Sequence, residues 1–279
     1  MSEVANAEQL AAWDGDEGEH WSTHEERYDA ATSVHSELLI DLAAIEPSEQ
    51  VLDLGCGCGA STRDSARAAH DGAAVGIDLS SQMLDVARRR AAEEGLDNVS
   101  FVHGDAQVHA FPPATYDVVI SRFGAMFFGD PSAAFTNVGG AMRPGGRVAL
   151  IAWQELARNE WLSAIRGALA QGRDLPTPPA GMPGPFGLAD PDRVRMILSQ
   201  AGFQDVRLDE VEAPVRLGVD ADDAYGFVKD LGMVHGLLQD LAPDQQAAAR
   251  TELRAVIESH AGADGVDFGS RAWTIRAVR

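Results

Sequence analysis

Residues 51–62 have the sequence VLDLGCGCGAST, in which an apolar run with one acid leads into three glycines at alternate positions. The run VLDL has the composition of a short buried strand, and glycines let a chain turn sharply and approach a ligand closely. A glycine-rich turn after the first strand is the shared device of nucleotide-binding doubly wound sheets. The stretch therefore predicts an α/β fold with a cofactor at Gly55, Gly57 and Gly59, and leaves open which adenosine-bearing molecule is bound.

Asp78, in the segment VGIDLS of residues 75–80, is the second part of such a site. An acid at the end of the second strand can accept hydrogen bonds from both ribose hydroxyls. Asp78 follows Gly59 by 19 residues, a spacing that suits a nicotinamide dinucleotide and S-adenosylmethionine equally well. Gly55, Gly57 and Ala60 also satisfy the looser dinucleotide fingerprint GxGxxA, which is a weak signal on its own.

Asp53, two residues before the first glycine, discriminates between the two cofactors. A carboxylate at this position would repel a pyrophosphate, but it can attract the ammonium group of an amino acid, directly or through water. S-Adenosylmethionine carries such an ammonium group and no phosphate. Asp105, in the Gly104-Asp105-Ala106 stretch after the third predicted strand, can in addition accept a hydrogen bond from an adenine amino group.

Five segments carry a resemblance to one family, and they are VLDLGCGCG (51–59), VGIDLS (75–80), GDAQ (104–107), YDVVISRFGAMFF (116–128) and MRPGGRVAL (142–150). Their order is that of the motifs of the class I S-adenosylmethionine-dependent methyltransferases, which residues 50–153 resemble. The acidic run WDGDEGEHW and the following helix further resemble the ubiquinone/menaquinone-biosynthesis-like branch, which includes many natural-product methyltransferases. Cys58 departs from the family pattern, where threonine or serine is common, but it is still a small residue.

The resemblance implies that S-adenosylmethionine is the cofactor, and it assigns residues to each part of that molecule. The implied contacts are Asp53, Gly55, Gly57 and Gly59 at the methionine end, Asp78 and Leu79 at the ribose and adenine, and Asp105 and Ala106 at the adenine edge. Cys56, in the same glycine turn, is a further implied cofactor contact. Met83 contacts adenine or belongs to the core. Trp21 and Tyr28 close over the methionine group or pack an amphipathic helix against the sheet.

Ser121 ends the fourth predicted strand, and open parallel sheets bind ligands beyond the carboxyl ends of their strands. We therefore expect residues 121–128 to face both the transferred methyl group and its acceptor, with Ser121 at the cofactor. Apolar side chains in and near this segment predict a hydrophobic or aromatic acceptor. These side chains are Phe123, Met126, Phe127, Phe128, Trp153, Trp161 and Phe186.

No catalytic residue is assigned, because methyl transfer from a sulfonium depends mainly on positioning and on the exclusion of water. The candidate bases carry no spacing signal and are better explained as surface or capping residues; they are His20, His24, His103, His109 and His235. Cys56 and Cys58 share one loop with no second cysteine pair, so neither a zinc site nor a disulfide framework is expected.

The chain has 22 basic and 43 acidic side chains and a formal net charge of −21. Such a surface repels nucleic acid and anionic membranes, so we expect neither as a partner. The first residues lack the basic and apolar regions of a signal peptide, and no run of eighteen apolar residues occurs, which predicts a cytoplasmic protein. The oligomeric state is left open, a homodimer being one option.

The order of elements predicts a Rossmann-like, doubly wound and mostly parallel seven-stranded sheet with helical cap insertions. We expect an N-terminal helical segment over the cofactor site (1–48), an S-adenosylmethionine-binding core (49–154), a helix and Pro/Gly-rich lid (155–189) and the completion of the sheet (190–279), with a cap at about 216–262. The first helix is predicted from Ser22, as N-cap, to about Ile45. Two helices are predicted between residues 220 and 260, and Asp130-Pro131 and Asp190-Pro191 predict two further helix starts.

The leading functional hypothesis is transfer of a methyl group from S-adenosylmethionine to a small hydrophobic or aromatic metabolite, most simply to oxygen. Carbon and nitrogen acceptors stay open. One alternative is a nicotinamide-dependent oxidoreductase on a similar sheet, which Asp53 disfavours. Another is a non-catalytic protein that keeps the fold and binds S-adenosylmethionine, because the motifs report cofactor binding and not turnover.

Overall fold

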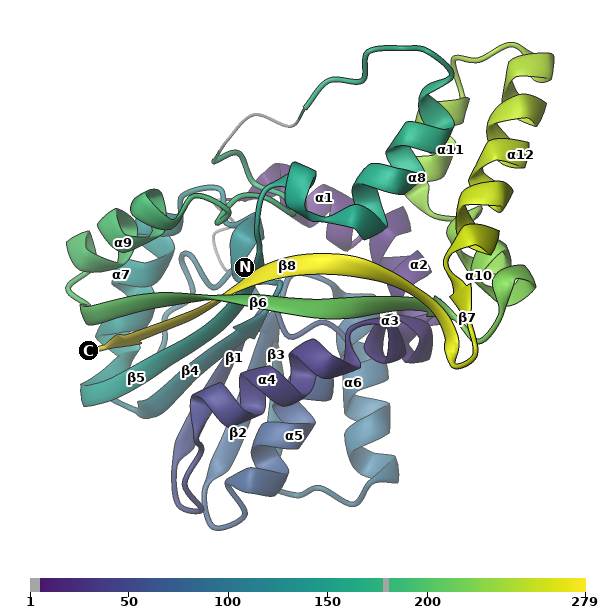
Figure 1. Cartoon of the computed structure of the whole chain (residues 1–279). Coiled ribbons are helices and arrows are strands. Elements are labelled where there is room, and N and C mark those ends of the chain that lie inside the picture. Colours follow the sequence, from purple (N-terminus) through teal and green to yellow (C-terminus); the bar gives the residue numbers. More distant parts are fainter. Residues whose placement is uncertain (1–5, 178–180) are drawn as a thin grey trace.

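The computed structural model describes residues 6–177 and 181–279. Their strands form one sheet in the order β3-β2-β1-β4-β5-β8-β6, with the short β7 paired to β8 (Figure 1). The strands are β1 Gln50–Leu54, β2 Ala73–Asp78, β3 Val99–His103, β4 Tyr116–Arg122, β5 Met142–Trp153, β6 Gln204–Gly218, β7 Ala261–Gly262 and β8 Gly265–Val278. Strands β1 to β5 are parallel, whereas β8 is antiparallel to both β5 and β6. The predicted Rossmann-like, mostly parallel sheet is confirmed, and among the described residues the two-residue β7 adds an eighth strand to the seven expected.

Strand β1 lies between β2 and β4, and its residues 51–54 are buried. Continuous burial of this kind is typical of a parallel strand that helices cover on both faces. The register sets Asp53 beside Gly76 of β2 and Ile120 of β4. From β1 the chain proceeds to β2 on one side and returns to β4 on the other, so the strand order reverses here. Open α/β sheets bind their ligands at such a reversal.

Helices cover the two faces of the sheet. On one face lie α4 Ser33–Ala43, α5 Ala60–Ala68 and α6 Ser81–Glu93, and on the other lie α7 Pro131–Ala141 and α9 Pro191–Gln200 (Figure 1). The Asp130 side chain accepts the N–H of Ala133 at 3.0 Å, and the Asp190 side chain accepts the N–H of Asp192 at 2.9 Å. Both predicted helix starts are therefore confirmed, with a proline in the first turn of each helix.

The N-terminal helical segment differs from its prediction. Instead of one helix from Ser22, four helices follow one another: α1 Ala7–Trp13, α2 Asp16–Thr23, α3 Glu25–Ala31 and α4. Ser22 lies inside α2, where its hydroxyl donates to the carbonyl of Glu19. The helical path breaks at His24 and Thr32, and the Thr32 hydroxyl donates to the carbonyl of Tyr28. Such side-chain bonds compete with the helical ladder and often bend it, a local effect that the predicted cap did not include.

The cap consists of α8 Glu160–Ala170 together with α10 Ala221–Val228, α11 Gly232–Leu238 and α12 Pro243–Ser259, so the insertion after β6 holds three helices rather than the two predicted. Two short 3₁₀ helices, Ala125–Phe127 and Leu156–Arg158, complete the described elements. Strands β6 and β8 form a long hairpin, and the cap insertion leaves and rejoins the sheet where Gly218 pairs with Val266. Among the described residues, no helix is both long and apolar enough to cross a membrane.

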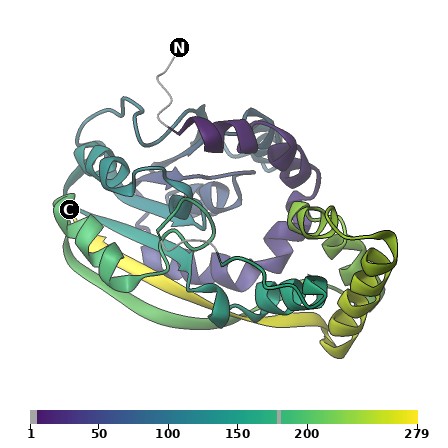
Figure 2. The same ribbon diagram turned by 90° about the horizontal axis from the view of Figure 1, so that it is seen from above.

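The N-terminal helices lie beside the cap, as the view from above shows (Figure 2). Arg27 of α3 forms an ion pair with Asp223 of α10 and donates at 2.9 Å to the carbonyl of Leu217 at the end of β6. These contacts join α3 to α10 of the cap and to the end of β6. The predicted lid includes residues 178–180, which lie outside the described residues.

Candidate active site

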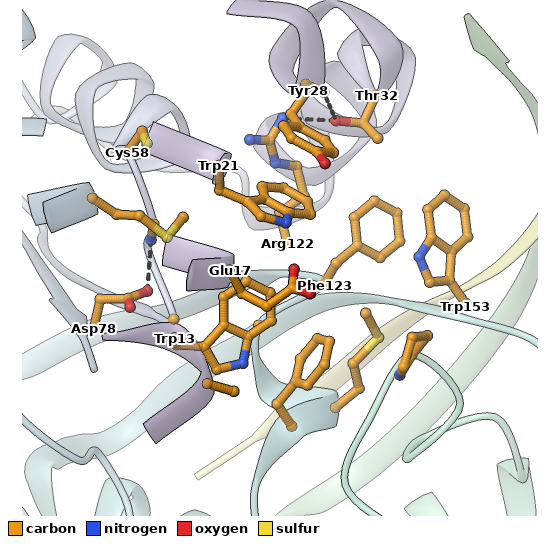
Figure 3. Close-up of a pocket in the computed structure, with 18 of the residues that line it drawn as sticks. Trp13, Glu17, Trp21, Tyr28, Thr32, Cys58, Asp78, Arg122, Phe123 and Trp153 are labelled. Atoms are coloured by element: carbon orange, nitrogen blue, oxygen red, sulfur yellow. Dashed lines mark hydrogen bonds between the residues drawn. The ribbon is translucent and has the colours of Figure 1, made fainter. Parts of the chain in front are cut away.

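A cavity of about 620 Å³ opens at the carboxyl ends of β1, β2 and β4 (Figure 3). Its wall comes from the N-terminal helices, the turns after the parallel strands, α8 and the cap. The predicted site residues in this wall are Trp21, Tyr28, Gly55, Cys56, Gly57, Asp78, Leu79, Met83, Asp105, Ala106, Phe123, Met126, Phe127, Trp153 and Phe186. Residues from distant parts of the sequence thus meet in one space.

The glycine turn approaches its neighbours too closely for a side chain. Gly55 has φ +63°, and a methyl group on it would lie 2.8 Å from the Cα of Gly124. The N–H of Gly57 donates to Asp78 at 2.7 Å, and the other oxygen of Asp78 accepts the N–H of Ser80 at 2.9 Å. Burial raises the pKa of Asp78, while these N–H donors favour its charged form. The turn and the second-strand acid therefore form one rigid unit.

Asp105 is held at another side of the cavity by backbone donors. It accepts the N–H of Asn6 at 3.0 Å and the N–H of Gln107 at 2.9 Å. The side-chain amide of Asn6 donates at 3.0 Å to the carbonyl of Phe127. The start of α1 thus closes over this part of the wall. Asp105 lines the cavity, and a carboxylate oxygen is a suitable acceptor for the amino group of a ligand.

Asp53 lies behind the cavity wall rather than in it. It is fully buried, and one oxygen accepts the hydroxyls of Ser61 and Thr62, each at 2.7 Å. The other oxygen has no partner among the described residues, and burial raises the pKa of Asp53 to about 6. Because Ser61 itself lines the cavity, any influence of Asp53 on a ligand passes through that hydroxyl or a water. Direct contact, one of the two expected modes, does not fit this placement.

Gly59 and Ser121 also lie outside the cavity wall, and each has a structural role. Gly59 precedes α5, where a methyl group would lie 2.7 Å from the ring of Phe101. The Ser121 hydroxyl donates to the carbonyl of Leu54 at 2.6 Å and accepts the N–H of Ala125 at 2.9 Å. Ser121 therefore ties the end of β4 to β1 and fixes the position of the loop that follows.

Arg122, which the sequence analysis did not single out, reaches the cavity next to Ser121. Its guanidinium donates to the carboxylate of Asp29 at 2.7 Å and to the hydroxyl of Thr32 at 3.2 Å. All three residues line the cavity. The ion pair holds the Arg122 guanidinium in a fixed place at the cavity wall, and guanidinium groups suit planar carboxylates.

Aromatic rings cover the remaining wall. Phe123 has φ +60°, an uncommon backbone conformation for a bulky residue, and its ring stacks on Trp153 with centroids 3.8 Å apart. Trp21 stacks on Tyr28 with centroids 3.5 Å apart. Trp161 lines the same wall, and its indole N–H is buried without a partner among the described residues. Strained backbone that persists at a cavity indicates a position held by its surroundings.

The histidines considered as bases do not form part of the described cavity wall. His35, which is fully buried, lies behind it, 5.3 Å from the ring of Phe123 and 4.9 Å from that of Trp153. Burial lowers the pKa of His35 to about 4, so the ring is neutral at pH 7. Cys58 lines the cavity, but burial raises the pKa of its thiol to about 12, which leaves it protonated and a poor nucleophile.

Comparison with known proteins agrees with this geometry. Residues 51–146 match a family model described as a methyltransferase domain. The nocamycin O-methyltransferase of Saccharothrix syringae is 32% identical over 235 residues, an alignment that covers 80% of this chain and 82% of that protein. The chain belongs to the S-adenosylmethionine-dependent methyltransferases. Its cofactor is therefore S-adenosylmethionine, and the alternative of a nicotinamide-dependent oxidoreductase is excluded.

Other relatives of this methyltransferase match over shorter segments or by fold. The aklanonic acid methyltransferase DauC of Streptomyces sp. (strain C5) is 34% identical over 112 residues, which is 40% of this chain and 51% of that protein. The crystal structure of the YcgJ protein from Bacillus subtilis superposes with a TM-score of 0.59 at 19% identity, covering 88% of this chain and 98% of that one. At this identity the second match shows the shared fold alone.

The methyltransferase's own residues fit the cofactor. A methyl group at Gly57 would lie 2.8 Å from the end of the Met83 side chain, so the absence of a side chain keeps the space between turn and helix open. Acceptors at Asp78 and Asp105 face that space from two strands, which suits a molecule with hydroxyls at one point and an amino group at another. The charge of Arg122 suits the carboxylate of a bound amino acid.

The sequence did not indicate the wall residues Trp13, Glu17, Glu25 and Asp29, whereas Arg122 lies inside the segment 121–128 that was expected to face the reaction. The first four belong to the N-terminal helices, whose orientation no local motif specifies. One signal was available: Glu17 and Trp21 are four residues apart, a spacing that places both on one face of a helix. Once Trp21 was expected at the cofactor, Glu17 followed from it.

Proposed function

We propose that the enzyme transfers the methyl group of S-adenosylmethionine to a hydroxyl oxygen of a small hydrophobic or aromatic metabolite. The observation that carries this proposal is the division of one cavity into a polar part and an aromatic part. We name the first the cofactor half, made by Gly55, Gly57, Asp78, Leu79, Met83, Asp105 and Ala106. The acceptor half is made by Phe123, Met126, Phe127, Trp153, Trp161 and Phe186.

In this proposal the chain holds and orients the reactants. S-Adenosylmethionine supplies, when bound, a methyl group on a sulfonium that is already activated for in-line displacement. Asp78 binds the ribose hydroxyls, Asp105 the adenine amino group and Arg122 the carboxylate. Trp21 and Tyr28, stacked on each other, exclude water from the side of the N-terminal helices. Phe123 and Trp153 offer a flat apolar surface on which an aromatic acceptor can stack.

The relatives support oxygen as the acceptor atom and a natural product as the substrate, because the relative aligned over 80% of the chain is the nocamycin O-methyltransferase. The test is release of S-adenosylhomocysteine from S-adenosylmethionine in the presence of a panel of phenols, quinols and carboxylic acids. We expect turnover with at least one phenol or quinol, with the product methylated on oxygen by mass spectrometry. Binding of S-adenosylhomocysteine without turnover on any acceptor would instead support the non-catalytic alternative.

A further inference from the structure

The cavity wall contains five described acids, and four of them are engaged by the protein itself. The engaged acids are Glu25 with Arg90, Asp29 with Arg122, Asp78 with the N–H groups of Gly57 and Ser80, and Asp105 with those of Asn6 and Gln107. Glu17 is the fifth, and its carboxylate forms no hydrogen bond or ion pair among the described residues of the chain. A charged acceptor group is thus available to a ligand.

Helix geometry places Glu17 on the cavity side of α2, where its carboxylate is accessible both to solvent and to a bound acceptor. Glu17 and Trp21 share one face of α2, and Trp21 lines the cavity and stacks on Tyr28. Figure 3 shows the Glu17 carboxylate between the indoles of Trp13 and Trp21, turned to the same side as Phe123. Burial and the charge of Glu17 both raise the pKa of Tyr28, which agrees with a carboxylate close to that ring.

The cap leaves room for this carboxylate. Gly232, the first residue of α11, lies against it, and a methyl group at that position would lie 2.7 Å from Glu17 Oε1. The surroundings are aromatic and apolar: Trp13, Trp21, Tyr28, Leu231 and Met233 all line the same wall. The titratable groups that interact with Glu17 are Tyr28 and His20, and His20 in turn interacts with His24, Asp230 and His235.

We propose that Glu17 is the catalytic base of this methyltransferase: it accepts a hydrogen bond from the acceptor's hydroxyl and takes its proton during transfer. This inference rests on the proposed O-methylation. In the step, an oxygen lone pair of the acceptor forms the new bond to the methyl carbon, and the electron pair of the broken C–S bond stays on sulfur. The acceptor's O–H proton goes to the Glu17 carboxylate, so the sulfonium becomes a neutral thioether and the carboxylate a carboxylic acid.

The first test measures the bound acceptor and does not need turnover. The probe is 4-nitrophenol, whose ionised form absorbs visible light, added to the protein saturated with S-adenosylhomocysteine. A phenol that donates to a carboxylate keeps its proton to a higher pH, because the charged partner disfavours the phenolate. We therefore expect the pKa of bound 4-nitrophenol to fall by about one unit in Glu17→Gln relative to the unmodified enzyme. An unchanged pKa, or no binding of 4-nitrophenol, overturns the proposal.

The second test follows the reaction with the best phenol of the panel across pH 6 to 10. General base catalysis contributes ~100-fold or more, so Glu17→Gln should lower kcat by about that factor at pH 6 and change KM little. The deficit should shrink as pH rises, because the phenol then ionises unaided, and Glu17→Asp should recover part of the rate. A loss that is equal at pH 6 and pH 10 would indicate a structural role and contradict the proposal.

Glu19→Gln is the matched control. It removes the same charge from the same helix, and Glu19 is exposed like Glu17, but Glu19 does not line the cavity. Its kcat and its bound 4-nitrophenol should match those of the unmodified enzyme, and calorimetry should give equal S-adenosylhomocysteine affinities for both variants. A pKa shift in Glu17→Gln without turnover by the unmodified enzyme would contradict the proposed function while leaving Glu17 as the hydroxyl-binding group.

Discussion

The cofactor half of the cavity is formed by turns that follow neighbouring strands. The acceptor half also contains side chains of α8, and the N-terminal helices and the cap enclose this half. The first half is fixed by backbone: N–H groups hold Asp78 and Asp105, and Gly55 touches Gly124. The second half is fixed by ring contacts and by a strained Phe123. Backbone contacts between parallel strands specify one shape, while ring packing tolerates exchange of hydrophobic groups. We therefore expect the two halves to respond differently to substitution.

The largest effect is expected at the backbone contact of the cofactor half. Gly55→Ala sets a side chain at positive φ against Gly124, which should lower S-adenosylhomocysteine affinity by about 4 kcal/mol, or ~1000-fold. Gly95→Ala is the control, because Gly95 has φ +67° with nothing within 4 Å of an added methyl group. It should lose only about 1 kcal/mol of stability and bind normally. Calorimetry and urea unfolding distinguish the two, and equal binding by both would refute the importance of this contact.

A second pair of variants replaces the buried titratable group that lies behind each half of the cavity. Asp53, behind the cofactor half, has its pKa raised from the usual 3.8 to about 6, so its stabilising contribution is complete below pH 3.8 and is lost as pH rises through 6. His35, behind the acceptor half, has its pKa lowered from 6.5 to about 4, so its contribution is complete above pH 6.5 and is lost as pH falls through 4. Each group contributes about 3 kcal/mol to the free energy of unfolding. The two contributions change with pH in opposite directions.

Urea unfolding between pH 4 and 7 separates these contributions. In Asp53→Asn the free energy of unfolding should fall more steeply with acid than in the unmodified enzyme, because only the His35 slope remains. In His35→Gln it should instead rise as the pH is lowered toward 4. Parallel curves for the three proteins would contradict the burial of both groups.

Asp78→Ala should weaken ligand binding in the cofactor half alone, and by less than Gly55→Ala. A hydrogen bond to a charged group contributes about 2 kcal/mol, so S-adenosylhomocysteine affinity should fall by ~30-fold. Binding of 4-nitrophenol to the acceptor half should change by less than about twofold, since additivity holds for separate sites. Survival of full cofactor affinity in this variant would remove Asp78 from the cofactor site.

The smallest effect is expected in the acceptor half. Phe123→Leu keeps the backbone strain but removes the stack with Trp153, and aromatic pairs contribute about 1 kcal/mol beyond their area. We expect the KM for a phenol to rise by ~5-fold with S-adenosylhomocysteine affinity unchanged. A fall in cofactor affinity instead would mean that Phe123 belongs to the cofactor half.

The structure brings the predicted residues Gly57, Asp78 and Asp105 together in one cavity wall, and their positions were predictable because their determinants are local. Asp78 ends β2, while Gly57 and Asp105 lie in the turns that follow β1 and β3, and parallel strands bring their carboxyl ends to one edge of the sheet. Asp53 shows the limit of this reasoning. Its position in the strand was clear, but which side of the glycine turn its carboxylate faces depends on Ser61 and Thr62 in the packed helix.

The acceptor half was predictable in character but not in composition. An apolar run after β4 indicated Phe123, Met126 and Phe127, yet no motif indicated Trp13, Glu25 or Asp29 in the N-terminal helices. Glu17 belongs to the N-terminal helices, whose path bends at His24 and Thr32 and which contact the cap through Arg27, whereas Arg122 is placed by β4. Such contacts join residues nearly 200 positions apart, a distance over which periodicity carries no information.

The hairpin of β6 and β8 has a consequence for how this enzyme can be diversified. The insertion between β6 and β8, residues 219–264, leaves and rejoins the sheet at the Gly218–Val266 pair, so its two ends lie side by side in the sheet. A segment attached in this way can be exchanged for another of different length with little entropic penalty, since loop closure varies only slowly with length. The β6–β8 pair is thus a position at which the insertion, and with it the acceptor selectivity, can change while the methyltransferase core stays the same.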